Sequence, residues 1–209
     1  MTVGRAQLSG PALVVAPRLL GATLLSEVGG LRVSARITEV EAYEGERDPA
    51  SHAYRGPTRR NEVMFGEAGR LYCYFVYGMH WCANVTCGRT GVAAAVLLRS
   101  AQLLEGETVA RSRTPGHPGT AKLASGPARL ARSLGLSGEH TGLDLLAAGS
   151  PVRLASLVAI GEYEAGPRVG VAVAQDHPWR FWLPGEPSVS SYRRGGRRRG
   201  PGNGQTGSP

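Results

Sequence analysis

The spacing of apolar residues divides the first third of the chain into a helix, a strand and a long loop. Residues 11–25 carry apolar side chains at helical intervals, which predicts a helix followed by a loop at Gly29. Apolar and polar side chains alternate through most of residues 31–42 with the two-residue period of a half-buried strand, and Glu41 falls at the end of that strand. Residues 45–69 are polar and rich in Arg and Gly, so we expect a long loop with room for a short helix.

Residues 71–87 contain two stretches that are rich in aromatic and β-branched residues, one on each side of Gly78. This pattern predicts a β-hairpin with Tyr77, Gly78, Met79 and His80 at or near its tip. One interpretation is a hairpin that simply packs one face against the core. The other is that Tyr77 protrudes as a wedge and occupies the gap that an extruded base leaves in a duplex.

The second half of the chain alternates further strands and helices. Residues 92–98 form a continuous apolar run of strand length, so Arg99 is expected to emerge where that strand leaves the core. The pattern further predicts helices over residues 102–109 and 127–134 and strands over residues 152–160 and 168–173. We therefore expect one domain over residues 1–191. Residues 192–209 have too few apolar side chains for a core, and they predict a disordered basic tail.

The chain is strongly basic, with a formal net charge of +8 and a sequence pI of 10.0. Such a surface attracts polyanions, although the charge alone suits DNA, RNA, an anionic membrane or an acidic protein equally well. Only Lys122 among the 24 basic residues is a lysine.

The cysteines and the apolar runs bear on compartment and cofactors. The first residues lack a basic cluster followed by an apolar run, and the later apolar stretch is interrupted, so neither a signal peptide nor a membrane span is predicted. Cys73, Cys82 and Cys87 are odd in number and match no common zinc spacing, although His80 lies among them; buried thiols are the favoured interpretation. We expect no metal, no cofactor and no membrane partner. The expected location is the bacterial cytoplasm, around the nucleoid, or the nucleus in a eukaryote.

Two carboxylates in the first strand are the earliest candidates for chemistry. Glu39 and Glu41 share one face of a regular strand, opposite Val40, so the pair requires either solvent or a cleft. A solvated strand end is the common case for such residues. In a cleft, Glu41 could instead act as a general base that activates water, as the hydrolysis of a glycosidic bond requires.

Ordered segments along most of the chain resemble the alkyladenine (3-methyladenine) DNA glycosylase family. The resemblance runs from residue 13 to about residue 191 with little insertion. The segments are EVEAY at 39–43, SH at 51–52, RRN at 59–61, MF at 64–65, GRLYCY at 69–74, YGMH at 77–80, Asn84, LLR at 97–99, GP at 126–127, PRVG at 167–170 and WRFW at 179–182. Ala128 and Arg129 depart from the Gly-Lys pair expected after GP, and Arg and Lys are not interchangeable at a phosphate contact.

The resemblance implies an α+β fold: a single compact mixed domain with a curved, antiparallel, β-rich sheet, flanking helices and a protruding β-hairpin. It implies that Glu41 is the general base and that Arg99 holds either Glu41 or the attacking water. The remaining roles carried over are a base pocket walled by Tyr43, His52 and Tyr74, exclusion of guanine by Asn84, intercalation by Tyr77, and DNA contacts from Met79, His80, Arg59 and Arg60.

The implied activity is that of a monofunctional DNA N-glycosylase, which starts base excision repair. It would bind double-stranded DNA as a monomer, flip a damaged purine (3-methyladenine, 7-methylguanine, hypoxanthine or ethenoadenine) and cleave the glycosidic bond with water. Lys122 lies outside the matched catalytic segments, so no amine is expected to form a Schiff base with the sugar and cleave the strand.

Two alternatives belong to other classes of protein. The basic, tyrosine-rich surface also suits a non-catalytic nucleic-acid-binding module whose rings stack on single-stranded bases. A zinc deaminase is disfavoured because the chain lacks the His-x-Glu and Pro-Cys-x-x-Cys pattern of that chemistry.

Overall fold

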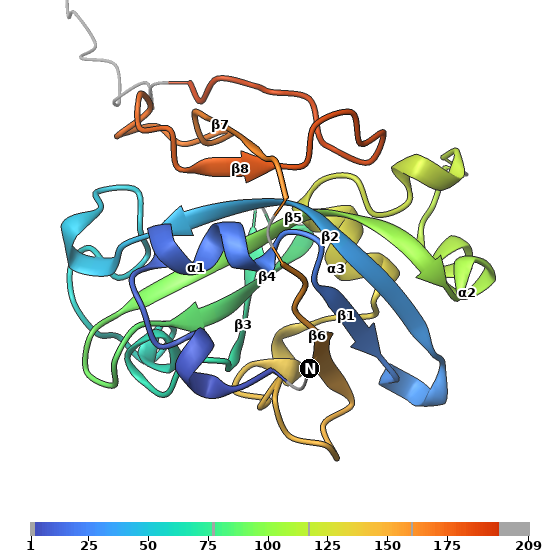
Figure 1. The fold of residues 1–209 in the computed structure, drawn as a ribbon, viewed down its shortest axis with the longest axis horizontal. Helices are drawn as coiled ribbons and strands as arrows, with labels where there is room; N and C mark the ends of the chain where they lie inside the picture. Colours follow the sequence, from blue (N-terminus) through green and yellow to red (C-terminus); the bar gives the residue numbers. More distant parts are fainter. Residues whose placement is uncertain (1–2, 77, 117, 160, 197–209) are drawn as a thin grey trace, which may run out of the picture.

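One antiparallel sheet organises the molecule (Figure 1). The computed structural model describes residues 3–76, 78–116, 118–159 and 161–196. The main strand order is β3-β4-β5-β2-β1-β6, and β8, which also pairs with β7, joins β2. The strands are β1 (Thr23–Ser26), β2 (Val33–Tyr43), β3 (Leu71–Val76), β4 (His80–Cys87), β5 (Ala94–Glu105), β6 (Val152–Ser156), β7 (Glu164–Gly166) and β8 (Arg180–Trp182). The expected α+β class, with a β-rich sheet and a hairpin, is confirmed.

The long strand β2 is paired on both sides where it carries its two carboxylates. One edge of β2 pairs with β5. The other edge pairs with β1 at residues 33–36 and with β8 at residues 39–41. Glu41 therefore lies between Leu97 of β5 and Arg180 of β8. Pairing on both sides satisfies the backbone there and fixes the direction in which the Glu41 side chain leaves the sheet.

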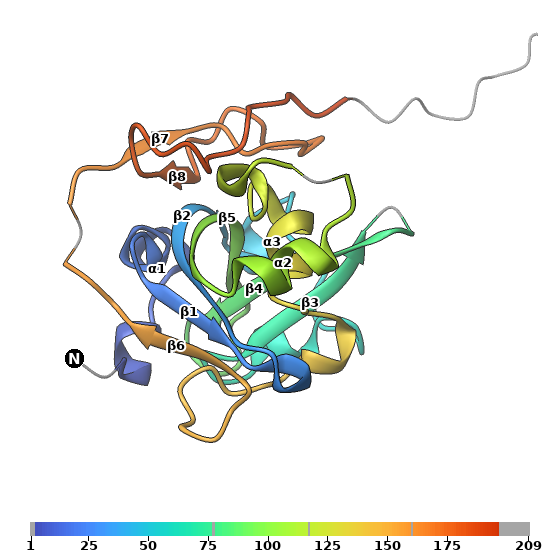
Figure 2. The same cartoon turned by 90° about the vertical axis from the view of Figure 1, so that its right-hand side faces the viewer.

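Helices cover the sheet from two sides, as Figure 2 shows, with α1 (Ala12–Leu19) on one side and α2 (Glu107–Arg113) and α3 (Pro127–Ser133) on the other. The buried face of α1 repeats at helical intervals through Ala12, Val15, Ala16 and Leu19. Helix α3 begins with Pro127 at its first turn, where a missing N–H costs nothing. The β3–β4 hairpin projects on the side of α3 (Figure 2).

The predicted helix over residues 11–25 is too long. Helix α1 ends at Leu19, and Thr23–Ser26 forms β1 between β2 and β6. Leu20 is already extended, and Gly21 adopts a left-handed conformation at φ 77° that turns the chain into the strand. A short apolar run suits a buried strand as well as a helix, so periodicity alone could not separate the two.

Two predictions in the second half are also corrected. Strand β5 continues to Glu105, so Arg99 lies inside the strand rather than at its exit, and α2 starts only after Gly106, at φ 81°. Residues 168–173 form a loop instead of a strand, because Gly170 adopts φ 74°. The hairpin, the short helix near residues 127–134 and the strand that starts at Val152 are confirmed.

The three thiols are buried and free, as expected. None of the helices in the described part of the chain is long and apolar enough to cross a membrane.

Candidate active site

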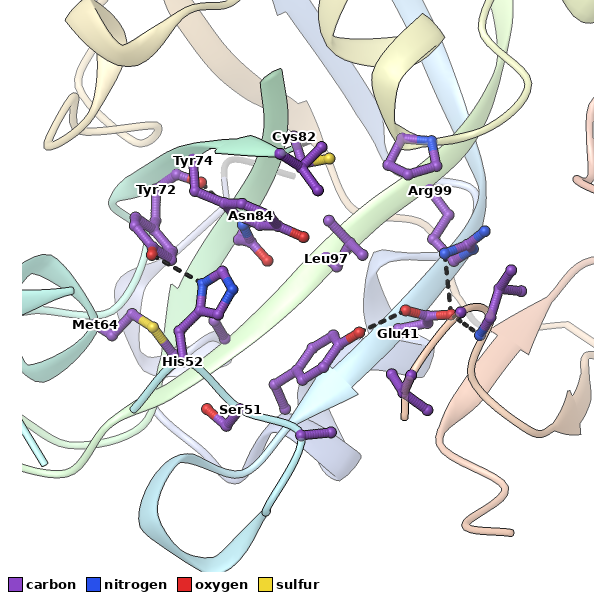
Figure 3. A pocket seen from close by; sticks show the side chains of 18 of the residues that line it. Glu41, Ser51, His52, Met64, Tyr72, Tyr74, Cys82, Asn84, Leu97 and Arg99 are labelled. Atoms are coloured by element: carbon purple, nitrogen blue, oxygen red, sulfur yellow. Dashed lines mark hydrogen bonds and ion pairs between the residues drawn. The ribbon is translucent and has the colours of Figure 1, made fainter. Parts of the chain in front are cut away.

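A cavity of about 670 Å³ opens beside the hairpin and brings together side chains from distant parts of the chain (Figure 3). Its walls come from β2, β5, both strands of the hairpin, the start of α3 and residues 169–173. A volume of this size is typical of sites that enclose a small molecule or a single base.

Glu41 is 0 % exposed and its carboxylate is held by three donors from different elements. Oε1 lies 3.1 Å from Nη1 of Arg99 and accepts the backbone N–H of Val169 at 2.7 Å. Oε2 accepts the hydroxyl of Tyr43 at 2.8 Å. Because a carboxylate offers about four acceptor positions, these three contacts orient Glu41 and still leave room for one water molecule.

Arg99 connects Glu41 to a second buried carboxylate. Its Nε donates to Oε1 of Glu39 at 3.0 Å while Nη1 faces Glu41, which places both carboxylates on one face of β2, as the strand period predicts. Burial alone would lower the pKa of Arg99, but the two carboxylates raise it above its ordinary value. The guanidinium therefore stays charged beside Glu41.

Glu39 is saturated with donors. Besides Arg99, it accepts hydrogen bonds from Arg180 at 3.0 Å, from Ser100 at 2.7 Å, and from the N–H and hydroxyl of Ser190 at 2.8 Å and 2.9 Å. Glu39 does not line the cavity. Of the two carboxylates, only Glu41 is placed to meet a ligand.

Aromatic rings form the wall that faces Glu41 across the cavity (Figure 3). The His52 ring meets the Tyr74 ring edge-on at 4.4 Å, and its Nδ1 lies 3.0 Å from the hydroxyl of Tyr72. Partial removal from water, followed by the charge of Arg60, lowers the pKa of His52, which favours its neutral form. The result is a rigid, uncharged surface suited to a flat ring.

Tyr43 adds a ring on the side of Glu41. Burial, followed by the negative charge of Glu41, raises the pKa of Tyr43 well above its ordinary value, so the phenol remains a donor to Glu41. The guanidinium of Arg168 lies over this ring at 4.7 Å and over the ring of Trp179 at 4.9 Å.

Arg168 is itself clamped in the interior. It is 1 % exposed and forms a two-pronged ion pair with buried Asp48 at 2.5 Å and 2.8 Å, while Nη1 also donates to the carbonyl of Ala42 at 3.0 Å. The Asp48–Arg168 pair thus fixes both Tyr43 and the adjacent Val169, and each of these donates to Glu41.

The predicted site residues divide into two groups. Those that line the cavity are Glu41, Tyr43, His52, Tyr74, His80, Asn84 and Arg99. Asn84 donates its amide N–H to the carbonyl of Tyr72 at 3.0 Å, which fixes the orientation of its side chain.

The other predicted residues lie outside this cavity. Met79 is 64 % exposed at the hairpin tip, Arg59 and Arg60 are exposed, and Arg60 lies 6.0 Å from the centre of the Tyr74 ring. Tyr77 lies outside the described residues. Among the described residues, no group of three or more His, Cys, Asp or Glu could hold a metal ion.

Sequence reasoning missed the residues that support the site. Asp48 and Arg168 are 120 positions apart, so no local pattern predicts their ion pair. Val169 donates to Glu41 through its backbone N–H, which does not depend on the type of its side chain. The available signal was indirect: Arg168 and Val169 belong to the matched PRVG segment. Tyr72 precedes the assigned Tyr74 by two positions on the same strand face.

A buried, oriented carboxylate lies opposite a wall of aromatic rings in a basic protein, an arrangement that suits the hydrolysis of a bond next to a flat ring. Residues 6–187 match the family model of methylpurine-DNA glycosylase (MPG). The chain therefore belongs to the methylpurine-DNA glycosylase family, which makes it a DNA repair hydrolase that acts on DNA in base excision repair.

Bacterial relatives are similar along nearly their whole length. A protein of Leifsonia xyli subsp. xyli (strain CTCB07) is 53 % identical over 199 residues, which is 91 % of this chain and 92 % of the relative. A protein of Mycobacterium leprae (strain Br4923) is 49 % identical over 201 residues, or 94 % and 92 % of the two chains. One of Rhodococcus jostii (strain RHA1) is 50 % identical over 184 residues, or 86 % and 80 %. All three carry the description "Putative 3-methyladenine DNA glycosylase".

Proposed function

We propose that this chain is a monofunctional N-glycosylase that flips alkylated or deaminated purines out of double-stranded DNA and releases them with water. The observation that carries the proposal is the placement of Glu41: a carboxylate oriented by three donors, in the wall of a cavity that is lined by tyrosine and histidine rings. The names of the relatives point to 3-methyladenine among the substrates.

The chemical step follows from this arrangement. A water molecule bound at the remaining acceptor position of Glu41, on Oε2, attacks C1′ of the extruded nucleotide and transfers a proton to Glu41. The new C1′–O bond forms as the bond from C1′ to the purine breaks, and the base leaves with the electron pair. Arg99 compensates the negative charge of Glu41 and holds the carboxylate in place during the reaction.

Lesion choice depends on the rings and on the charge of the base. A cationic base such as 7-methylguanine or 3-methyladenine leaves as a neutral molecule and is attracted to the electron-rich faces of Tyr43 and Tyr74. Hypoxanthine and ethenoadenine are neutral, so they depend more on stacking and on a proton supplied as they leave. Asn84, fixed by Tyr72, excludes the exocyclic amine of normal guanine by a steric clash.

DNA contacts are assigned to the residues that the family resemblance gives this role. Tyr77 enters the duplex, Met79 and His80 brace it against the opposite strand, and Arg59 and Arg60 meet phosphates. Arg129, exposed at the start of α3, supplies the charge of the lysine that the family pattern has at this position. The enzyme acts as a monomer in the bacterial cytoplasm, around the nucleoid.

The product is an abasic site in an intact strand. Strand cleavage by a glycosylase requires an amine that forms a Schiff base with the sugar. The only lysine, Lys122, donates its ammonium group to the carbonyl of Pro187 at 2.8 Å and does not line the cavity.

The proposal is tested with duplexes that carry one 3-methyladenine analogue, 7-methylguanine, hypoxanthine or ethenoadenine, incubated with wild-type protein and divided before alkali treatment. Strand breaks that arise only after alkali support a monofunctional glycosylase. Breaks before alkali would mean lyase activity. Tight binding of every duplex with no base release would instead favour a non-catalytic nucleic-acid-binding module.

A further inference from the structure

The chain returns to the active site after β8. The backbone N–H of Ser190 donates to Glu39 at 2.8 Å, and Nη2 of Arg99 donates to the Ser190 hydroxyl at 3.1 Å. We call residues 190–196 the C-terminal strap. Its first residue is thus joined to the ion pair that holds Glu41.

Further along, the strap follows the loop that forms one wall of the cavity. The N–H of Gly170 donates to the carbonyl of Arg193 at 3.0 Å. Gln175 bridges the two segments, since its amide nitrogen donates to Val171 at 2.8 Å and to Gly195 at 2.9 Å, and its amide oxygen accepts Nε of Arg194 at 3.1 Å.

Gly195 makes this approach possible. A Cβ added at this position would overlap the carbonyl of Val171. Because the obstructing atoms are backbone, no side-chain rotation could relieve the overlap. Any residue other than glycine would push the strap away from the loop.

The loop beneath the strap is clamped at its start by the Asp48–Arg168 pair and is irregular beyond Val169. No strand of the described chain lies between Gly166 and Arg180, and Ala174 adopts a left-handed φ of 50°. Yet this loop supplies Val169, which donates to Glu41, and residues 170–173, which line the cavity. The strap is therefore the outer layer of that wall.

The strap presents two arginines at this position. Arg193 and Arg194 are exposed, and neither forms an ion pair with any described residue. In Figure 2 the last described residues (red) run along the top of the molecule toward the side from which the β3–β4 hairpin projects. The DNA contacts proposed for the hairpin put the duplex on this side.

We propose that the C-terminal strap is a DNA-binding element, in which Arg193 and Arg194 contact backbone phosphates beside the extruded nucleotide. The inference rests on the proposed function, because it assumes that a base enters this cavity. The strap lies beyond the segment that matches the family model, which ends at residue 187. The guanidinium groups of Arg193 and Arg194, which are exposed and carry no carboxylate partner among the described residues, suit the paired oxygens of phosphate, whereas a neutral partner would gain nothing from them.

The test compares a charge-matched pair of double variants. Arg193→Gln/Arg194→Gln removes the strap charges, and Arg18→Gln/Arg32→Gln removes two exposed charges, one on α1 and one just before β2. Binding to a duplex with a stable abasic analogue is measured by fluorescence anisotropy between 50 and 200 mM salt, a range over which phosphate contacts dominate the salt response.

The strap variant is expected to bind about tenfold more weakly at physiological salt. The slope of log K against log salt should become shallower by about 0.9 for each phosphate that the variant no longer binds, while the control keeps the wild-type slope. A strap variant with the wild-type slope would overturn the proposal. This readout is DNA binding, so it tests the strap even if the wild-type protein releases no base. Absence of base release would refute the proposed function instead.

Gly195→Ala tests the anchoring separately, because it keeps both arginines and displaces the strap. It is expected to show the same loss of slope and, through the shifted Val169 loop, a slower single-turnover base release at saturating enzyme. The contradicting result is a Gly195→Ala protein that keeps the wild-type salt slope and the wild-type rate of base release, while the arginine double variant binds DNA weakly. It would mean that the arginines bind DNA without being anchored to the loop.

Discussion

Glu39 and Glu41 share the guanidinium of Arg99, at 3.0 Å from its Nε and 3.1 Å from its Nη1. The two carboxylates carry the same charge and lie on the same face of β2, but their surroundings differ. Glu39 is enclosed by hydrogen-bond donors, whereas Glu41 lies in the cavity wall with an acceptor position to spare. We infer that Glu39 fixes Arg99, and that Arg99 in turn fixes Glu41.

The first prediction concerns the acid stability that Glu39 provides. Burial alone would raise the pKa of Glu39, but the charge of Arg99 and the hydrogen bonds from Ser100 and Ser190 hold it below its ordinary value of about 4.3. Between these two values the unfolded chain binds more protons than the folded one, so this contribution is complete above about pH 4.3 and is lost as the pH falls through the folded-state pKa.

Urea unfolding at a series of pH values checks this. Glu39→Gln should be less stable than wild type at neutral pH, because Arg99 and Arg180 lose a buried counter-charge. The difference in the free energy of unfolding should stay constant down to about pH 5 and shrink below about pH 4.3, where Glu39 of the unfolded wild-type chain binds a proton that the folded protein still excludes. A difference that grows on acidification would contradict the assignment.

The second prediction concerns the buried pair Asp48–Arg168. Asp48→Asn leaves the Arg168 charge uncompensated in the interior and is expected to cost about 3 to 5 kcal/mol in the free energy of unfolding. The matched control is Asp176→Asn, at an exposed position, which should stay within about 0.5 kcal/mol of wild type. Equal stability of the two variants would show that the pair is not a structural clamp.

Arg168→Lys separates charge from geometry. Lysine keeps the charge but loses the planar fork and its stacking between Tyr43 and Trp179. We expect single-turnover base release to slow about tenfold, with little change in the affinity for DNA, because Tyr43 and Val169 would hold Glu41 less firmly. An effect on affinity alone would place Arg168 in DNA binding instead.

The third prediction isolates the hydroxyl of Tyr43. Tyr43→Phe retains the ring for stacking but removes the donor 2.8 Å from Glu41. A hydrogen bond to a charged group is worth about 1.5 to 3 kcal/mol, so base release should slow by roughly one to two orders of magnitude while the Kd for DNA is kept. Tyr54→Phe, at an exposed tyrosine outside the cavity, is the control. Weaker DNA binding with an unchanged rate would rule out this role.

The sequence predicted those parts of the fold whose pattern is local. The hairpin has a distinctive run of aromatic and β-branched residues around Gly78, and α3 begins at a proline, so both were recognisable. The segment Thr23–Ser26 was not, because a short segment around Leu24 and Leu25 can form either the last turn of a helix or an inner strand. What decided it was pairing with β2 and β6, a tertiary interaction.

The same division holds for the cavity. Glu41, Tyr43, Asn84 and Arg99 could be predicted because each lies within a matched segment and has a chemically distinctive side chain. The Asp48–Arg168 clamp joins residues from two loops, and nothing in the local sequence of either loop identifies its partner. The composition predicted a disordered tail from residue 192, but composition does not register the backbone hydrogen bonds that Arg193 and Gly195 make; residues 197–209 lie outside the described residues.

The measurement that tests the account most directly is single-turnover release of hypoxanthine from a duplex by wild type and Glu41→Gln, with the affinity of each for the same duplex measured in parallel. Glutamine retains the size of Glu41 but cannot accept the proton of the attacking water. We predict that release falls by at least about two orders of magnitude while Kd changes by less than about threefold. A Glu41→Gln protein that releases the base at the wild-type rate would contradict the assignment of Glu41 as the general base.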